Sequence, residues 1–160
     1  MRKLILIILV LAAPLFLRAQ TQIPPLNKQI VGYVKTVIGK KVERGECWDL
    51  AKVPLDLYKA DWDHSFNFGR EVDPLKDTIY PGDIIQFTKV TLKYVKEGQT
   101  WTEQMPQHTA IIYEVISPGV YKIAHQNTGY TGKKVGVSDL KLEDVSKGKI
   151  VFFRPFYKAN

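Results

Sequence analysis

The spacing of apolar residues predicts two helices near the start of the chain. Apolar positions recur every three or four residues between residues 26 and 38, which is the spacing of one helical face. Asn27 is placed to cap this first helix, and Gly39 is placed to end it. A second helix is predicted from Cys47 onward on the same grounds. Pro54 should kink or restart that helix, because it has no backbone N–H to donate.

After a loop-like stretch the pattern changes to the alternation that is typical of strands. The turn signals Glu97-Gly98-Gln99 and Ser117-Pro118-Gly119 separate the alternating runs. Helices followed by a meander of antiparallel strands indicate an α+β protein, with its N-terminal helices packed against a curved antiparallel sheet. The expected strands are 83–95, 100–103, 108–116, 120–127 and 149–154, with a long hairpin over 88–103 and a short helical turn over 138–145.

The beginning of the chain has the composition of a secretory signal peptide. A basic start is followed by an apolar run over residues 4–17 and by Ala19. The run is shorter than the roughly 20 apolar residues that a membrane-spanning helix needs. We therefore expect a signal peptide over 1–19, a lead-in segment over 20–29 and one domain over 30–157. The same reasoning predicts a secreted or periplasmic protein with no stable membrane span after cleavage.

Charge and cysteine content narrow the functional classes. The chain carries a formal net charge of +7, and three cations and no acids precede residue 20, so the remainder would carry +4. This modest positive charge favours binding to an acidic polymer. The sequence has no stripe of basic and aromatic residues, so we do not expect a nucleic-acid partner. Asp61, Asp63 and His64 fit a solvated loop better than a metal site, so we expect no metal and no cofactor.

The lone cysteine is the first candidate for chemistry. Cys47 follows Gly45 and Glu46 at the predicted start of a helix, where backbone N–H groups stabilise a thiolate and later an oxyanion. The acidic neighbours Glu46 and Asp49 oppose this activation. The alternative is that Cys47 is a small apolar filler of the helix face. Trp48 either lines a substrate groove beside the thiol or packs in the core.

Two histidines supply a candidate base and its partner. His108 begins one predicted strand and His125 lies near the end of the next. A turn centred between Ile116 and Ser117 would place the two imidazoles directly opposite each other on one face of the sheet. The alternative is that the two histidines make unrelated hydrogen bonds at the ends of their strands.

These residues resemble the CHAP and NlpC-type cysteine hydrolases. The resemblance covers residues 30–153 and implies a papain-like fold, with Cys47 as nucleophile, His108 as base and His125 as the group that orients the base. Asn127, Glu46 and Trp48 are then supporting residues, although the CHAP pattern has Gln where Glu46 stands. The matching blocks are 45–51, 81–87, 107–112 and 125–127.

The resemblance implies a cysteine amidase or peptidase that needs no cofactor. With the predicted export, it favours a secreted hydrolase that cuts peptide or amide bonds of peptidoglycan. One alternative is a catalytically weak or inactive CHAP-like binding module at the cell envelope. Another is a thiol-dependent acyltransferase, or a protease that acts on proteins instead of wall peptides.

Overall fold

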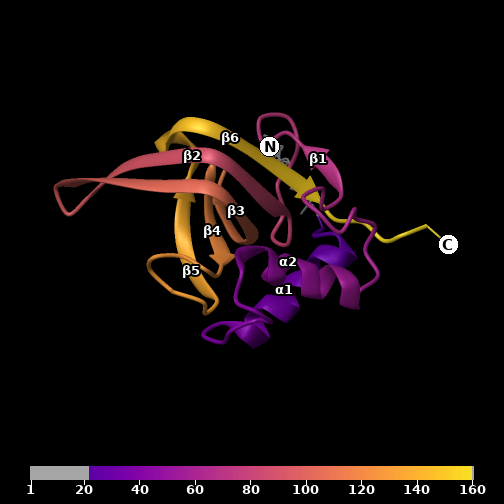
Figure 1. Ribbon diagram of the computed structural model, residues 1–160. Helices are drawn as coiled ribbons and strands as arrows, with labels where there is room; N and C mark the ends of the chain where they lie inside the picture. The colour runs from indigo at the N-terminus through magenta and orange to yellow at the C-terminus, as the bar shows by residue number, and fades with distance from the viewer. Residues whose placement is uncertain (1–21, 160) are drawn as a thin grey trace, which may run out of the picture.

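The computed structural model describes residues 22–159, so the predicted signal peptide over 1–19 lies outside the described residues. Within that range, two helices precede an antiparallel sheet, which confirms the α+β class (Figure 1). No helix in residues 22–159 has the length and apolar character needed to cross a membrane. The helices are α1 (Pro25–Val37) and α2 (Cys47–Leu57); the strands are β1 (Arg70–Val72), β2 (Ile84–Lys96), β3 (Gln99–Ser117), β4 (Val120–His125), β5 (Gly136–Lys141) and β6 (Val145–Arg154).

Helix α1 begins differently from the prediction. Prolines, not Asn27, start it: Pro24 is the N-cap residue and Pro25 the first helical residue, where a fixed φ and a missing N–H are tolerated. Asn27 lies one turn further in and is fully buried. Its amide nitrogen donates to Asp83 Oδ1 at 2.8 Å and to the carbonyl of Pro81 at 3.1 Å. Asn27 thus joins the helix to the start of the sheet.

Asp83 is the centre of this junction. Its carboxylate has no exposed surface and accepts hydrogen bonds from Arg154 Nη2 at 2.8 Å and from the backbone N–H of Tyr80 at 2.9 Å. Gly82 precedes it with φ +88°, and a Cβ there would lie 2.5 Å from the carbonyl oxygen of Asn27. Only glycine fits such a close approach at positive φ. The turn therefore holds α1, β2 and β6 together.

The six strands lie in the order β1-β6-β2-β3-β4-β5, and every neighbouring pair is antiparallel. The helical turn predicted over 138–145 is confirmed only at Leu142–Asp144, a short 3-10 helix; it is wrong over 138–141, which belong to β5. Strand pairing outweighs the local helical preference there, because Leu140 of β5 is buried when it pairs with Tyr121 of β4.

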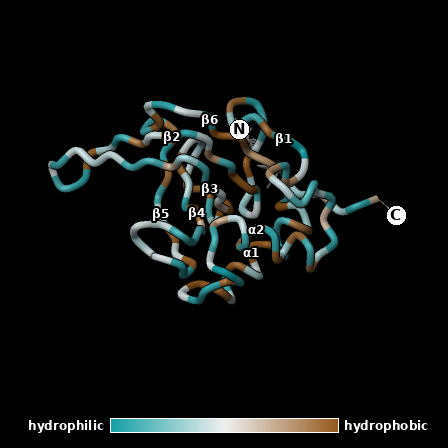
Figure 2. The backbone as a smooth tube through the Cα atoms, in the orientation of Figure 1, coloured by the Kyte–Doolittle hydropathy of each residue, from teal (hydrophilic) through white to brown (hydrophobic). Residues whose placement is uncertain are grey.

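Buried apolar side chains form a cluster on each face of the sheet, and the hydrophobic segments of its strands are coloured brown in Figure 2. One cluster joins α1 and α2 to Ile84, Ile111, Ala124 and Phe153. A second cluster lies on the opposite face, because its strand residues alternate with the first set. Its sheet members include Ile85, Phe87, Ala110, Ile112, Tyr121, Ile123 and Phe152.

The β2–β3 hairpin extends well beyond the rest of the sheet (Figure 1). Strand β3 continues through Pro106, which stands opposite Lys89 in β2, where the register passes from Thr88↔Gln107 to Val90↔Met105. Lys89 has φ +52°, so β2 is distorted where the proline cannot donate a hydrogen bond. The predicted break between 103 and 108 is therefore wrong.

Candidate active site

Cys47 is the first residue of α2 and is partly exposed. The first backbone N–H groups of a helix have no partner within the helix, and the helix dipole places partial positive charge there. Helix α2 continues to Leu57 with Pro54 inside it, so the predicted restart at Pro54 is wrong. The thiol therefore stands at a helix N-terminus, as the sequence predicted.

Asp49 serves as an anchor for the segment before the helix. Its fully buried carboxylate accepts hydrogen bonds from the backbone N–H groups of Arg44 at 3.1 Å and Glu46 at 3.0 Å, and from the Arg44 guanidinium at 2.9 Å. Burial by itself raises the pKa of Asp49, but these hydrogen bonds outweigh it and hold the pKa below its ordinary value. Its negative charge is therefore matched by Arg44.

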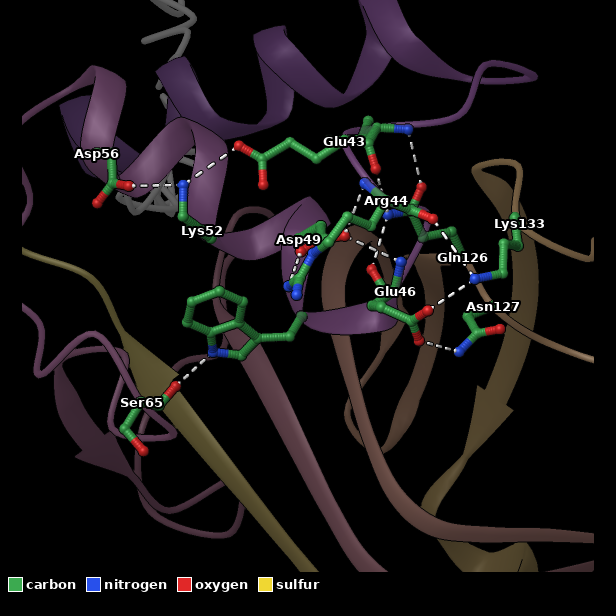
Figure 3. A network of polar contacts seen from close by, with 12 residues as sticks. Glu43, Arg44, Glu46, Asp49, Lys52, Asp56, Ser65, Gln126, Asn127 and Lys133 are labelled. Atoms are coloured by element: carbon green, nitrogen blue, oxygen red, sulfur yellow. Dashed lines mark hydrogen bonds and ion pairs between the residues drawn. The ribbon is translucent and has the colours of Figure 1, made fainter.

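The carboxylate of Glu46 makes polar contacts with two side chains of the β4–β5 loop (Figure 3). One carboxylate oxygen lies 2.7 Å from Lys133 Nζ, and the other accepts a hydrogen bond from Asn127 Nδ2 at 2.6 Å. Both oxygens act as acceptors, so the side chain of Glu46 donates nothing toward an oxyanion. The structure thus brings together two predicted supporting residues, Glu46 and Asn127.

Gln126 is a site residue that the sequence analysis did not assign. Its fully buried amide accepts from the N–H of Val42 at 3.1 Å and donates to the carbonyls of Val42 at 3.1 Å and Glu46 at 2.7 Å. These bonds tie the segment before Cys47 to the end of β4 (Figure 3). Its position between His125 and Asn127 was the signal, since alternation points its amide to the helix side of the sheet.

The two predicted imidazoles contact each other. His108 Nε2 lies 3.0 Å from His125 Nδ1, and His125 Nε2 lies 3.0 Å from Ser138 Oγ of β5. The pairing is diagonal, because Ile111 pairs with Ala124 and irregularities in β3 shift the register by two residues from the expected one. An even shift keeps both imidazoles on one face. Ser138 was missed, since its strand was predicted as a helical turn.

Both imidazoles are neutral near pH 7. Desolvation by burial lowers the pKa of His108 to about 4. Burial, with repulsion from His108, also lowers the pKa of His125 to about 4. If His125 donates its Nε2 proton to Ser138, its Nδ1 accepts the Nε2 proton of His108, and Nδ1 of His108 keeps an unprotonated lone pair that can act as a base.

The structure does not bond the thiol to this chain of imidazoles. Among residues 22–159, no hydrogen bond joins Cys47 Sγ to either histidine ring, and α2 packs on the sheet face opposite to them. Strand β4 ends at His125, however, so β3 has an open edge beside His108. Glu46 is held at that edge by Gln126 and Asn127.

Trp48 belongs to the packing of the domain. Its ring packs against the core cluster of the helices and lies 5.5 Å from the ring of Trp62, while its indole N–H donates to the carbonyl of Ser65 at 2.5 Å. Within the described chain, no group of three or more His, Cys, Asp or Glu side chains is arranged to hold a metal ion. In the predicted loop, His64 lies against Asp56 and Trp62 instead.

Acid is expected to destabilise the fold through the buried imidazoles. Unfolded imidazole titrates near pH 6.5, whereas His108 and His125 have a pKa of about 4, so the unfolded chain binds protons first as the pH falls. Their contribution to stability is complete above pH 6.5 and is lost between pH 6.5 and 4. From pH 7 to 5 we expect a loss of about 2 kcal/mol for each of the two imidazoles, because in this range the unfolded chain takes up the proton and the folded one does not.

Urea denaturation at constant ionic strength measures this loss. The double variant His108→Gln/His125→Gln should lose the dependence between pH 6.5 and 5. An unchanged dependence in the double variant would assign it to other groups.

A helix that begins with a cysteine, packed on an antiparallel sheet that carries a histidine pair, is compatible with a papain-like cysteine-proteinase fold. The sequence comparison agrees and is more specific: residues 25–159 match the AIM3/BBC1 cysteine proteinase-fold domain. The chain therefore belongs to the AIM3/BBC1 cysteine proteinase-fold domain family. The papain-like fold is confirmed, whereas the match does not place the chain among CHAP or NlpC-type hydrolases.

Two individual proteins are similar to the chain. "Altered inheritance of mitochondria protein 3" of Debaryomyces hansenii is 27% identical over 149 residues, which cover 81% of this chain and 16% of the relative. The chain thus spans about one sixth of that relative's length. The crystal structure of Ly7917 aligns with a TM-score of 0.48 and 13% identity, covering 79% of this chain and 62% of that one.

These findings correct the predicted biology. The prediction of a secreted hydrolase of peptidoglycan is wrong, because the family and its curated relative are those of a yeast protein named for mitochondrial inheritance. The predicted cell-wall substrate, secreted or periplasmic location and cell-envelope binding module are wrong on the same grounds. The error came from combining an apolar N-terminus with a resemblance to wall hydrolases.

Proposed function

We propose that this domain is a cysteine hydrolase that cuts amide bonds in polypeptides, with Cys47 as nucleophile, His108 as base and His125 as the residue that orients the base. The observation that carries the proposal is the hydrogen-bonded chain from Ser138 through His125 to His108, with 3.0 Å at each step. This arrangement of a base and its orienting partners is typical of a thiol protease. The membership in a cysteine-proteinase-fold family supports the same class.

The chemical step begins with proton transfer from the thiol of Cys47 to Nδ1 of His108, at the open edge of β3. The thiolate attacks the amide carbonyl carbon, and the imidazolium returns its proton to the leaving amine. Water then hydrolyses the thioester. Because Glu46 only accepts hydrogen bonds, the backbone N–H of Cys47 is the donor for the developing oxyanion.

Ser138 has a specific part in this scheme. As an acceptor for His125 Nε2–H, its hydroxyl selects the tautomer in which His108 Nδ1 is unprotonated. An imidazole in the third position resembles the NlpC-type arrangement, and Asn127 two residues later resembles the CHAP pattern. The proposed site therefore combines one feature of the NlpC-type arrangement with one feature of the CHAP pattern.

A second candidate is a peptide-binding domain without catalysis. The observation that favours it is Glu46, which places a carboxylate beside the thiol where an oxyanion would otherwise find a side-chain donor. A negative charge there opposes the charge that develops in amide hydrolysis.

Hydrolysis of fluorescein-labelled casein separates the two candidates. The purified domain should release soluble fluorescence at a rate that iodoacetamide abolishes, and Cys47→Ala should release none. Cys47→Ala is a small change at a partly exposed position, so its fold should be retained. Equal release by the wild-type domain and Cys47→Ala, or none from either on a panel of unfolded proteins, would contradict the hydrolase and favour the binding domain.

A further inference from the structure

Basic side chains gather on two segments that lie side by side at the start of α2. The backbone N–H of Gly39 donates to the carbonyl of Val135 at 2.8 Å, and the N–H of Val135 donates to the carbonyl of Lys40 at 2.8 Å. These bonds align the beginning of the α1–α2 connection with the loop between β4 and β5 (Figure 1). We call the exposed cations of the two segments the basic rim: Lys40, Lys41, Arg44, Lys133 and Lys134.

The basic rim borders the candidate nucleophile. Lys133 Nζ lies 2.7 Å from the carboxylate of Glu46, the residue before Cys47 (Figure 3). A Cβ on Gly45 would lie 2.7 Å from Cβ of Lys133, so the β4–β5 loop is packed directly on the segment that leads to the thiol. A ligand that contacts the rim is therefore within reach of Cys47.

The acids around the rim do not cancel its charge. Glu46 pairs with Lys133 and Asp49 with Arg44, while Glu43 lies 3.2 Å from Lys52 outside the rim. The side chain of Arg44 remains 70% exposed. Residues 126–136 contain two lysines and no acid. The rim thus keeps a positive excess carried by its remaining lysines, none of which pairs with an acid among the described residues.

The partner that fits this surface is an anionic polypeptide. The rim is short and lies beside Cys47. The one aromatic residue of the β4–β5 loop, Tyr130, is 87% exposed. An extended peptide can place acidic side chains on the lysines and its backbone beside the helix N-terminus. We infer that the basic rim binds an acidic stretch of polypeptide and presents the adjoining peptide bond to Cys47; this rests on the proposed function.

Binding to the inactive domain tests the inference without catalysis. In the Cys47→Ala background, a short fluorescein-labelled peptide of alternating Glu and Gly should bind roughly tenfold more tightly than its Gln counterpart at low salt. The difference should decrease as salt is added, because exposed charges are screened. Lys41→Glu/Lys134→Glu should remove the preference. Lys147→Glu/Lys149→Glu, which makes the same charge change on β6, should retain it.

Three outcomes would overturn the inference. In the first, the Glu and Gln peptides bind equally. In the second, the β6 variant loses as much affinity as the rim variant, which would mean that net charge alone attracts the peptide. Alternatively, the rim variant loses binding to phosphatidylserine vesicles or to duplex DNA while its binding to the Glu peptide is unchanged, which would assign the rim to another anion. None of these binding outcomes depends on casein hydrolysis. A failure of the basic-rim inference can therefore be distinguished from a failure of the proposed hydrolase function.

Discussion

His108→Ala is expected to lower the rate of casein hydrolysis by about two to four orders of magnitude, which is the usual contribution of a positioned general base. Without the imidazole, the thiol of Cys47 has no partner to take its proton, and the leaving amine has no acid. The loss should appear in kcat, since the imidazole acts on atoms that change charge in the transition state.

The variant needs controls because His108 is buried and bonded to His125. His108→Gln keeps a polar group that can bond to His125 but supplies no base, so it should fold and remain inactive. His64→Ala, at an exposed histidine with φ +56°, should retain full activity. If His108→Gln folds and hydrolyses casein at the wild-type rate, His108 is not the base.

Asp83→Ala is expected to lower the free energy of unfolding by about 3–5 kcal/mol, the usual cost of breaking a buried ion pair. The substitution leaves the Arg154 guanidinium, whose side chain is only 15% exposed, without its counter-charge. It also removes the acceptor for Asn27 Nδ2 and for the N–H of Tyr80. The junction between α1, β2 and β6 then holds several unsatisfied polar groups.

Urea denaturation monitored by tryptophan fluorescence measures this change. Lys76→Ala is the control, because it removes only a surface ion pair, that of Lys76 with Asp73, in which the side chain of the lysine is 82% exposed. That control should leave the midpoint unchanged. If Asp83→Ala has the midpoint of the control, the buried pair does not stabilise the fold.

The parts of the fold that sequence patterns predicted are those set by local periodicity. The helix from Cys47 and the strands around His108 and His125 follow from apolar spacing, and the structure has them. The predicted helical turn over 138–145 failed over 138–141, because pairing with β4 decides the conformation of β5. Asn27 failed as a cap because its partner, Asp83, is 56 residues away.

The candidate site was predicted in part for the same reason. Alternation places His108 and His125 on one face whatever the exact register, so their contact survived a shift of two residues. The role of Gln126 depends on its contacts with the segment before Cys47, and that of Ser138 on its contact with His125 of β4; no local pattern contains either. The substrate prediction failed because a cysteine and a histidine define a kind of bond chemistry and not the polymer that carries the bond.

The most direct measurement is the rate at which iodoacetamide alkylates the sulfur at position 47, the only thiol in the 160-residue sequence. At neutral pH the wild-type protein should react at least about tenfold faster than a folded His108→Gln protein, because the imidazole assists removal of the thiol proton. Equal rates in the two proteins would mean that the sulfur and the imidazole do not work together, and would contradict the account.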